Sequence, residues 1–422
     1  MTQKVSAKVV FIALVAALGG ILFGYDTAVI SGTTEVVKMQ FGLTTGGEGW
    51  YVGCALIGSI AGVLVAGMLS DFLGRKKTML ISALLFSVSA IGCALSADFT
   101  QLVIYRMIGG FGIGIVSIVS PVYISEVSPA EVRGTMVSLY QLFITIGFLL
   151  AYLANYLILR GTTIDEYWRP MLGAEAIPDL LFLVLIFFIP ESPRWLAVRG
   201  QRQDNSEAWK ALRERGILKA VLIGSAIAIL GQFMGVNAVL YYGPKIFADA
   251  GFPNPLFSTV LVGVVNMLTT VIALLIIDKV GRKQLVWWGV GGMIVCLVCI
   301  GLYFLPFTNL PNWFMLTFFL LYVFCTAISI SAVVFVLLSE MYPNRVRGLA
   351  MSIAGFALWI GTYLIGQLTP WMLENLTPAG TFFLFAFMCL PYLWIMYKHV
   401  PNTTGKTLEE IEDHWRAVGG TK

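Results

Sequence analysis

Charged residues are scarce in this chain of 422 residues. Asp, Glu, Lys and Arg make up 12% of the sequence and hydrophobic residues 58%, whereas roughly a quarter of the residues in a soluble domain are charged. This balance excludes an ordinary water-soluble domain. The formal net charge is +4, but the basic residues form short clusters between apolar runs, so we do not expect a nucleic-acid-binding protein.

Residue types that carry catalysis or bind metals are also few. The two histidines, His399 and His414, lie near the end of the chain, and no nucleophile–base pair or metal-ligand spacing occurs in the apolar runs. The six cysteines fall within apolar runs, so they indicate neither a disulfide framework nor, at Cys296 and Cys299, a zinc site. We therefore expect no enzyme, no metal site and no cofactor.

Long apolar runs are abundant. A bilayer core of about 30 Å requires roughly 20 helical residues, and twelve runs meet this length. The first is too long for the core of a signal peptide, so we expect it to remain as a span. The sequence predicts an all-α membrane protein with twelve transmembrane helices at 9–31, 50–70, 78–97, 101–124, 134–159, 169–190, 218–248, 256–278, 284–305, 313–340, 348–373 and 380–400.

Two motifs occur twice, in the same order. Residues 71–77 (Asp-Phe-Leu-Gly-Arg-Lys-Lys) are echoed at 278–284, and residues 125–134 are echoed at 339–348. Two echoes in register indicate two homologous halves. The predicted domains are a six-helix bundle at 1–190, an amphipathic cytoplasmic linker at 191–217, a second six-helix bundle at 218–400 and a cytoplasmic tail at 401–422.

The loops differ in their content of lysine and arginine. The loops of one side contain nearly all the basic clusters, including the segment 191–217, and both termini lie on that side. Because basic loops stay in the cytoplasm, we expect both termini to be cytoplasmic.

Three ionisable residues stand out inside predicted spans, where charge is costly and commonly functional. Asp26, Arg106 and Glu175 are each about 7–11 Å below the outer end of their span, at about 1.5 Å per helical residue. They could therefore meet. The arginine would keep one carboxylate ionised, whereas burial and a second carboxylate would favour the protonated form of the other. This arrangement suits proton binding; the alternative is a static ion pair between helices.

A second set of polar side chains lies near the middle of the spans and carries no charge. Amides that donate and accept, beside an aromatic ring, suit a ligand with many hydroxyl groups. Amides also join helices without binding anything. The candidates are Gln141, Gln232, Asn237, Asn266 and Trp359.

The third set consists of charged residues at the cytoplasmic ends of the spans. Carboxylates and arginines recur in both halves, so ion pairs between the halves could hold the cytoplasmic side closed. Solvated interfacial charges are the alternative. The candidates are Asp71, Arg75, Glu126, Arg133, Glu191, Arg194, Asp278, Arg282, Glu340 and Arg347.

Several stretches of the sequence resemble motifs of a known protein family. Residues 23–32 (Phe-Gly-Tyr-Asp-Thr-Ala-Val-Ile-Ser-Gly), 190–196 (Pro-Glu-Ser-Pro-Arg-Trp-Leu) and 232–237, with the two Gly-Arg-Lys loops, resemble the sugar porter family of the major facilitator superfamily. The resemblance covers nearly the whole chain. It implies two six-helix bundles around a central sugar site, in a monomer of the bacterial inner membrane that alternates between outward-open and inward-open states.

The resemblance also implies a role for Asp26. Proton-coupled members of the family, to which residues 23–32 are most similar, have aspartate at this position, whereas passive facilitators have asparagine. Arg106 and Glu175 match the arginine and glutamate of the proton-coupled members.

The chain departs from the family at its expected sugar pocket. Glutamines are missing from three of its spans, and a Gly-Pro break followed by a tryptophan is missing from the tenth. We expect a pocket that is more apolar than is usual in the family. The substituting residues are Phe148, Gly231, Ser331, Ala332, Phe335 and Leu358, of which Phe335 stands at the tryptophan position and remains a candidate sugar contact.

The sequence therefore predicts a secondary transporter that moves a monosaccharide, a pentose or a hexose, together with a proton. A passive uniporter of the same fold is the nearer alternative. The second alternative is a sugar sensor that binds sugar without transporting it, although sensors generally have long cytoplasmic extensions.

Overall fold

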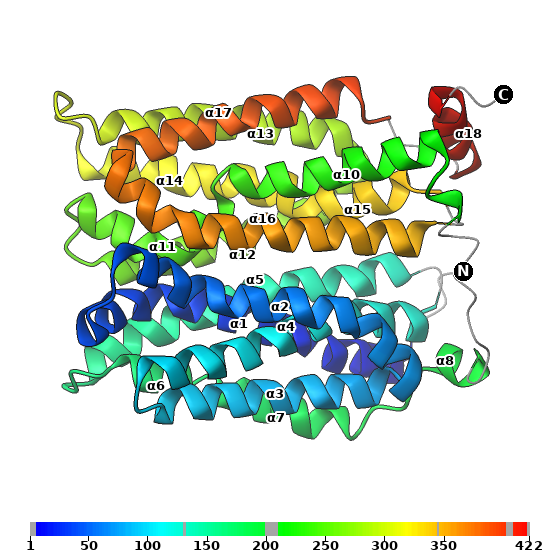
Figure 1. Ribbon diagram of the computed structural model, residues 1–422, viewed down its shortest axis with the longest axis horizontal. Coiled ribbons are helices and arrows are strands. Elements are labelled where there is room, and N and C mark those ends of the chain that lie inside the picture. Colours follow the sequence, from blue (N-terminus) through cyan, green and yellow to red (C-terminus); the bar gives the residue numbers. More distant parts are fainter. Residues whose placement is uncertain (1–5, 130–131, 199–209, 344–345, 402–407, 420–422) are drawn as a thin grey trace. The chain divides into compact units, whose positions relative to one another are not determined.

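The computed structural model describes residues 6–129, 132–198, 210–343, 346–401 and 408–419, and within these ranges its regular secondary structure is helical (Figure 1). Eleven helical stretches among these residues are long and apolar enough to cross a membrane. The prediction of an all-α membrane protein is confirmed. The helices of the first half are α1 (Ala7–Phe41), α2 (Thr45–Leu73), α3 (Arg75–Leu95), α4 (Phe99–Val127), α5 (Arg133–Gly161), α6 (Trp168–Gly173), α7 (Ala176–Ile186) and α8 (Pro193–Val198).

The second half has the same kind of long helix, with interruptions in its first and fourth spans. Its elements are α10 (Arg215–Phe233), α11 (Val236–Asp249), α12 (Pro255–Val280), α13 (Arg282–Tyr303), α14 (Asn312–Thr326), the π-helix η1 (Ala327–Ser331), α15 (Ala332–Met341), α16 (Arg347–Asn375), α17 (Thr377–Lys398) and α18 (Leu408–Gly419). Most of the predicted linker, 199–209, lies outside the described residues.

The predicted sixth span is not one helix but two, α6 and α7. Pro178 has no backbone N–H to offer the carbonyl of Ala174, and that carbonyl accepts instead from the N–H of Ile177 at 3.2 Å. The helix tightens at this point, and Glu175 lies between its two parts. The sixth span is therefore absent from the eleven single stretches although its residues are helical.

Two further interruptions lie in the second half. The span 218–248 breaks at Met234 and Gly235, where Gly235 has a φ of 88°. The tenth span contains η1, whose wider turn ends at Ser331, next to Ala332. These are the two residues that stand in place of the expected Gly-Pro break, so an irregular turn is present there without proline.

The chain forms two compact units. Unit 1 consists of Met1–Gln201, Leu240–Met267 and Gly366–Pro370, and unit 2 consists of Arg202–Val239, Leu268–Ile365 and Trp371–Lys422. Unit 1 therefore takes in most of α11 and the first part of α12. The domain boundaries expected from the sequence, at 190 and 218, stay a prediction.

Glycines bring the helices of unit 1 into close contact. A Cβ on Gly20 or Gly24 would overlap the carbonyl oxygens of Tyr140 and Ile144 on α5, and one on Gly110 would overlap the carbonyl of Ala55 on α2. Helix backbones that touch in this way gain dispersion contacts that do not depend on water, which is how spans associate in lipid. The α1–α5 and α2–α4 pairs are built on such contacts.

The sequence repeat is also a repeat of backbone geometry. Gly74 and Gly281, in the two Gly-Arg-Lys loops, have φ values of 96° and 92°, a region that favours glycine. The residues before α5 and α16, Val132 and Val346, have φ/ψ of −119°/1° and −121°/−3°. Equivalent loops in the two halves thus adopt the same conformation.

Each half also contains the same ion pair beneath its glycine loop. Arg75 donates from Nε and Nη2 to the two carboxylate oxygens of Glu126, both at 3.0 Å. Arg282 pairs with Glu340 at 2.9 Å in the second half. A bidentate pair fixes direction as well as distance, so these contacts hold the start of the third helix of each half against the end of its fourth.

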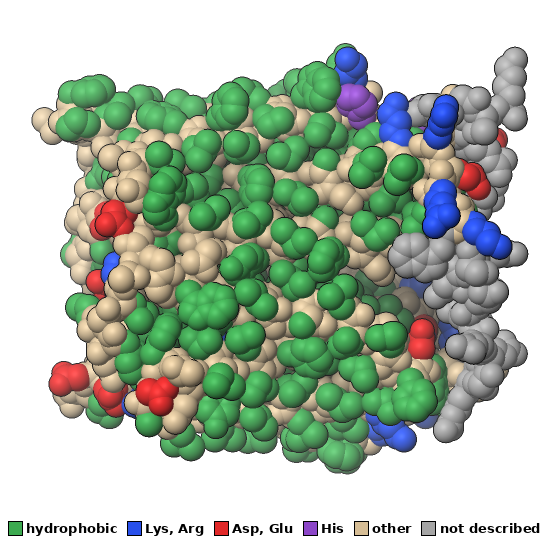
Figure 2. Space-filling model, in the orientation of Figure 1, with side chains coloured by type: hydrophobic (Ala, Val, Ile, Leu, Met, Phe, Trp, Pro, Cys, Tyr) green, Lys and Arg blue, Asp and Glu red, His purple; other side chains and the backbone are tan. Residues whose placement is uncertain are grey.

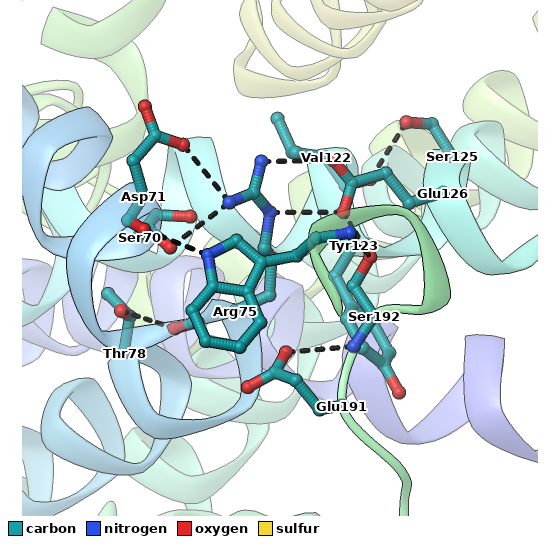
Figure 3. A network of polar contacts seen from close by, with 12 residues as sticks. Ser70, Asp71, Arg75, Thr78, Val122, Tyr123, Ser125, Glu126, Glu191 and Ser192 are labelled. Carbon is teal, nitrogen blue, oxygen red and sulfur yellow. Dashed lines mark hydrogen bonds and ion pairs between the residues drawn. The ribbon is translucent and has the colours of Figure 1, made fainter. Parts of the chain in front are cut away.

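In unit 1 the Arg75–Glu126 pair belongs to a larger network (Figure 3). Ser192 donates its hydroxyl to Glu126 at 2.5 Å, and the Glu191 carboxylate accepts from the backbone N–H of Lys76 at 3.0 Å. The indole of Trp195 donates to the carbonyl of Asp71 at 2.8 Å. The Pro-Glu-Ser-Pro-Arg-Trp-Leu stretch, which follows α7 and begins α8, therefore binds the end of α2, the start of α3 and the end of α4.

Hydrophobic side chains cover most of the visible face, and basic side chains gather at helix ends (Figure 2). Many large apolar side chains are exposed on both units, including Leu64, Ile104 and Leu157 on unit 1 and Leu222 and Phe387 on unit 2. A soluble protein rarely exposes so much apolar surface. Lipid is the solvent that this surface fits.

Replacement of Gly24 by alanine should destabilise unit 1. The new methyl group would collide with the Ile144 carbonyl in the α1–α5 contact, which should cost about 1–3 kcal/mol as overpacking. Thermal unfolding in detergent micelles measures the effect. Gly67→Ala on α2 is the control, because a Cβ there meets nothing within 4 Å; equal melting temperatures for the two variants would contradict the close contact.

Replacement of Glu126 by glutamine should also lower the melting temperature. The change leaves the Arg75 guanidinium, 12% exposed, without its bidentate partner, which should cost about 1–3 kcal/mol. The matched control is Asp71→Asn, because Asp71 is 66% exposed and an exposed pair contributes little. An Asp71 variant that is as unstable as the Glu126 variant would contradict the assigned importance of Glu126.

Candidate functional site

Asp26 on α1 and Arg106 on α4 form a buried ion pair. The Nη1 group of Arg106 donates to Oδ1 of Asp26 at 2.7 Å and to its backbone carbonyl at 3.5 Å. Each side chain is about 2–3% exposed. The second Asp26 oxygen, Oδ2, and Nε of Arg106 have no hydrogen-bond partner among the described residues.

Glycines near the ion pair bring its helices close to other helices. A Cβ on Gly109, one turn after Arg106, would overlap the Ser89 hydroxyl on α3. Gly24 brings α1 against α5 two residues before Asp26. Close helix contacts therefore surround the two charged residues.

Glu175 lies close to the pair without a direct bond to it. Its carboxyl is 3% exposed and interacts electrostatically with Asp26 and Arg106, and its Oε1 has no hydrogen-bond partner among the described residues. The structure thus brings the three predicted ionisable residues into one region. Their role in proton coupling stays a prediction.

The sequence reasoning missed a fourth ionisable residue, Asp179. It is fully buried, in the first turn of α7, and interacts electrostatically with Asp26 and Glu175. The available signal was direct: Asp179 is a carboxylate inside the predicted span 169–190, four residues after Glu175 and hence on the same side of a helix.

A small cavity lies beside the ion pair. Its volume is about 10 Å³, which is room for about one water molecule. Its lining combines the two charged side chains with apolar and aromatic groups. The lining residues are Asp26, Thr27, Ile30, Val52, Ala55, Leu56, Arg106, Ile113 and Tyr241. The space suits a proton or a water molecule, and it is far too small for a sugar ring.

Tyr241 reaches this cavity because α11 is fastened to unit 1. Lys245 donates to the buried carboxylate of Glu48 at 2.6 Å, and Lys38 donates to the other oxygen of Glu48 at 2.7 Å. Tyr242 donates its hydroxyl to the carbonyl of Gly366 at 2.7 Å. These bonds hold one helix of the second half of the sequence over the ion pair of the first.

Two of the predicted sugar-binding amides meet in unit 2. The side-chain oxygen of Gln232, at the end of α10, accepts from the amide of Asn237 at 2.6 Å and from the hydroxyl of Thr362 on α16 at 3.2 Å. The break at Gly235 lets α10 and α11 present both amides at one place. Both side chains are partly exposed, so their remaining hydrogen-bonding capacity is open to a polar ligand.

The other predicted sugar contacts lie on several helices of the two units. Gln141 on α5 is partly exposed, whereas Asn266 on α12 and Trp359 on α16 are buried. The side chain of Phe335 lies outside the described residues. Phe148 is 7% exposed and packs against Tyr152 on its own helix. Sugar binding by these residues stays a prediction.

The predicted cytoplasmic ion pairs occur within each half among the described residues, as Arg75–Asp71, Arg75–Glu126 and Arg282–Glu340. Arg133 and Arg194 are exposed, and Arg347 donates to the carbonyl of Tyr342 at 3.4 Å. The side chain of Asp278 lies outside the described residues. The expected closure by pairs between the halves stays a prediction.

The chemistry of the site follows from these contacts. The described residues include no cluster of three or more histidine, cysteine or acidic side chains that could hold a metal ion. What the site offers is a set of buried carboxyls beside one guanidinium, in helices of a membrane protein, and ionisable groups in such a position are commonly functional.

Comparison with known proteins gives one consistent result. The family described as "Sugar (and other) transporter" matches residues 12–214 and 201–415. The arabinose-proton symporter of Bacillus subtilis is 37% identical over 96% of this chain and 95% of its own length. The D-xylose-proton symporter of Escherichia coli is 37% identical over 98% and 97%. The glucose transporter of Staphylococcus epidermidis is 34% identical over the full length of both chains.

Solved structures agree with this result. The inward-open xylose transporter of E. coli matches with a TM-score of 0.84 and 37% identity, over 96% of this chain and 99% of that one. A structure of the D-xylose-proton symporter matches with a TM-score of 0.83 over 94% and 99%. The likeness thus covers the sequence, its repeat and its fold, and the chain is an integral membrane protein that belongs to the sugar transporter family of the major facilitator superfamily and is not an enzyme.

Proposed function

We propose that this protein is a secondary active transporter that carries a monosaccharide and a proton together across a bacterial inner membrane. The observation that carries the proposal is the buried pair of Asp26 and Arg106, joined at 2.7 Å inside the membrane-spanning helices α1 and α4. Relatives of 37% identity are named as proton symporters for arabinose and for D-xylose. Sequence, site and relatives therefore support the same function.

A buried ion pair suits proton coupling because the attraction between its two charges only just offsets the cost of removing them from water. Removal of two charges from water costs several kcal/mol for each ion, and the attraction between them offsets this cost only while the contact is good. A change that loosens the Asp26–Arg106 contact leaves the Asp26 carboxylate uncompensated in an apolar site, where protonation is the cheapest remedy. A proton can therefore bind or leave as the helices move.

The polar cluster of Gln232, Asn237 and Thr362 supports the sugar-binding part of the proposal. Amide and hydroxyl groups at a helix break can pair with the donors and acceptors of a sugar ring, and specificity for hydroxyls arises because unpaired polar groups are costly. Arabinose, xylose and glucose are the sugars in the names of the relatives. The substrate of this chain is thus proposed to be a pentose or a hexose.

The proposal also includes the membrane location, the orientation and the oligomeric state of the protein. The exposed apolar side chains fit a lipid bilayer. The excess of lysine and arginine in the loops expected on the same side as the two termini fits cytoplasmic termini. We propose that the protein works as a monomer, since each chain contains both repeated halves. A passive uniporter is the second candidate function, and the test of Asp26 below separates the two.

The sharpest test concerns Asp26. Asp26→Asn is nearly isosteric but cannot ionise, so it imitates the permanently protonated form. In proteoliposomes with an imposed pH gradient, the variant should lose sugar accumulation completely and should retain sugar binding and exchange between two sugar-loaded sides. Asp165→Asn, in an exposed turn, is the matched control and should accumulate sugar like the parent.

Two results would overturn the coupling assignment. Accumulation by the Asp26 variant at the level of the parent would remove Asp26 from the coupling site. A parent protein that equilibrates labelled pentoses or hexoses without any response to the pH gradient would replace symport by uniport.

The sugar site is tested through its amides. Gln232→Ala and Asn237→Ala should each weaken sugar binding by about 1–3 kcal/mol, because a sugar hydroxyl loses its partner. This loss corresponds to about 5–150-fold in Kd, measured by calorimetry on folded protein. Asn375→Ala, at an exposed amide of α16 that contacts its own helix, should leave Kd unchanged. Unchanged affinity in both amide variants would remove the cluster from the sugar site.

A further inference from the structure

Asp179 is a buried acid that the proposed mechanism has not used. Its side chain is fully buried, and neither of its carboxyl oxygens has a hydrogen-bond partner among the described residues. A buried carboxylate without a partner is one of the most costly groups that a protein can contain, and such a group stays neutral by holding a proton. Its persistence in this position therefore needs an explanation.

The surroundings of Asp179 contain acids rather than bases. α7 packs against α1 and α3. On α1, Asp26 interacts electrostatically with Asp179, and so does the hydroxyl group of Tyr25, which has no hydrogen-bond partner among the described residues. Glu175 lies one turn earlier on the same span and also interacts with it.

The helix α3 contributes a thiol and distant cations. Cys93 interacts electrostatically with Asp26, Glu175 and Arg106, and it adds no positive charge. The basic residues of α3 lie at its first turn, where the amine of Lys76 donates to the carbonyl of Phe187 at the far end of α7. Asp179 therefore has no basic side chain beside it among these described neighbours.

The buried region contains more carboxyl groups than positive charges. The carboxyls are those of Asp26, Glu175 and Asp179. The guanidinium of Arg106 lies with them and bonds directly to Asp26. One ionised carboxylate balances the guanidinium. Two further ionised carboxylates would be uncompensated and would repel each other, so this arrangement favours a proton on Glu175 and another on Asp179.

We propose that Asp179 is a second proton-binding carboxyl of the transport site, whose charge sets the pH at which Asp26 exchanges its proton. This inference rests on the proposed function of the Asp26–Arg106 pair. In conformations in which Asp179 ionises, its negative charge helps Asp26 to retain a proton. Tyr25, which precedes Asp26 on α1, interacts electrostatically with both Glu175 and Asp179.

The first experiment detects the proton directly. Infrared spectra of the purified, reconstituted protein should contain a carbonyl band of a protonated carboxyl group that is absent in Asp179→Asn and displaced in Asp179→Glu. Asp165→Asn, in an exposed turn, is the control and should leave the band unchanged. A spectrum in which Asp179→Asn removes no protonated band at neutral pH would overturn the inference.

The second experiment measures the consequence for transport. The pH at which proton-driven sugar uptake falls to half should move down by about one unit in Asp179→Asn, because one neighbouring negative charge is lost. Asp179→Glu should restore the pH profile, and Asp179→Leu should resemble Asp179→Asn. A merely structural acid would change the amount of folded protein in these variants and leave the pH midpoint of the remaining uptake in place, which would overturn the inference.

The two experiments separate this inference from the proposed function. If the parent shows no pH-dependent uptake, symport fails, and the infrared measurement alone still decides whether Asp179 holds a proton. If Asp26→Asn abolishes accumulation while Asp179→Asn leaves both the carbonyl band and the pH midpoint unchanged, symport stands and the role of Asp179 is refuted.

Discussion

The cost of charge in an apolar medium is the constraint on which the rest of this structure depends. The protein places Arg106 and Asp26 where neither could remain ionised alone, and their 2.7 Å contact is what makes both tolerable. Near them, glycine contacts bring α1 against α5 and α2 against α4. Packing and electrostatics therefore depend on each other: if α1 and α4 moved apart, the Asp26 carboxylate would lose its ionic partner, and binding a proton would become favourable.

The two halves are a repeat in geometry as well as in sequence. Gly74 and Gly281 share one backbone conformation, and each is followed by an arginine that pairs with the carboxylate at the end of the next helix, Glu126 or Glu340. Among the described residues, the buried charged groups at the candidate site are not repeated in this way: Asp26, Arg106, Glu175 and Asp179 all belong to the first half, whereas the amide cluster of Gln232 and Asn237 belongs to the second. The two halves thus share a scaffold, but the proposed proton site lies in the first half and the proposed amide site in the second.

Much of this could be predicted from the sequence, for physical reasons. Helix length and the thickness of a bilayer define the spans, and a rise of about 1.5 Å per residue was enough to place Asp26, Arg106 and Glu175 at one depth. Depth does not tell which groups touch, so only the structure distinguishes the direct Asp26–Arg106 bond from the more distant Glu175. Asp179 was missed although the same rule applied to it. The helix interruptions depend on backbone hydrogen bonds, which cannot be predicted from hydropathy. Pro178 divides the sixth span, and η1 forms without a proline that would have indicated it in the sequence.

The π-helix η1 has a consequence for how such a protein can evolve. A wide turn inserts one extra residue into the helical repeat, so the side chains after Ser331 face about 100° away from the directions that a regular α-helix would give them. A proline keeps a bend at one sequence position, whereas a substitution that restored regular α-helical hydrogen bonds at Ala327–Ser331 would turn all of these side chains at once. The directions in which the side chains of α15 face therefore depend on one wide turn.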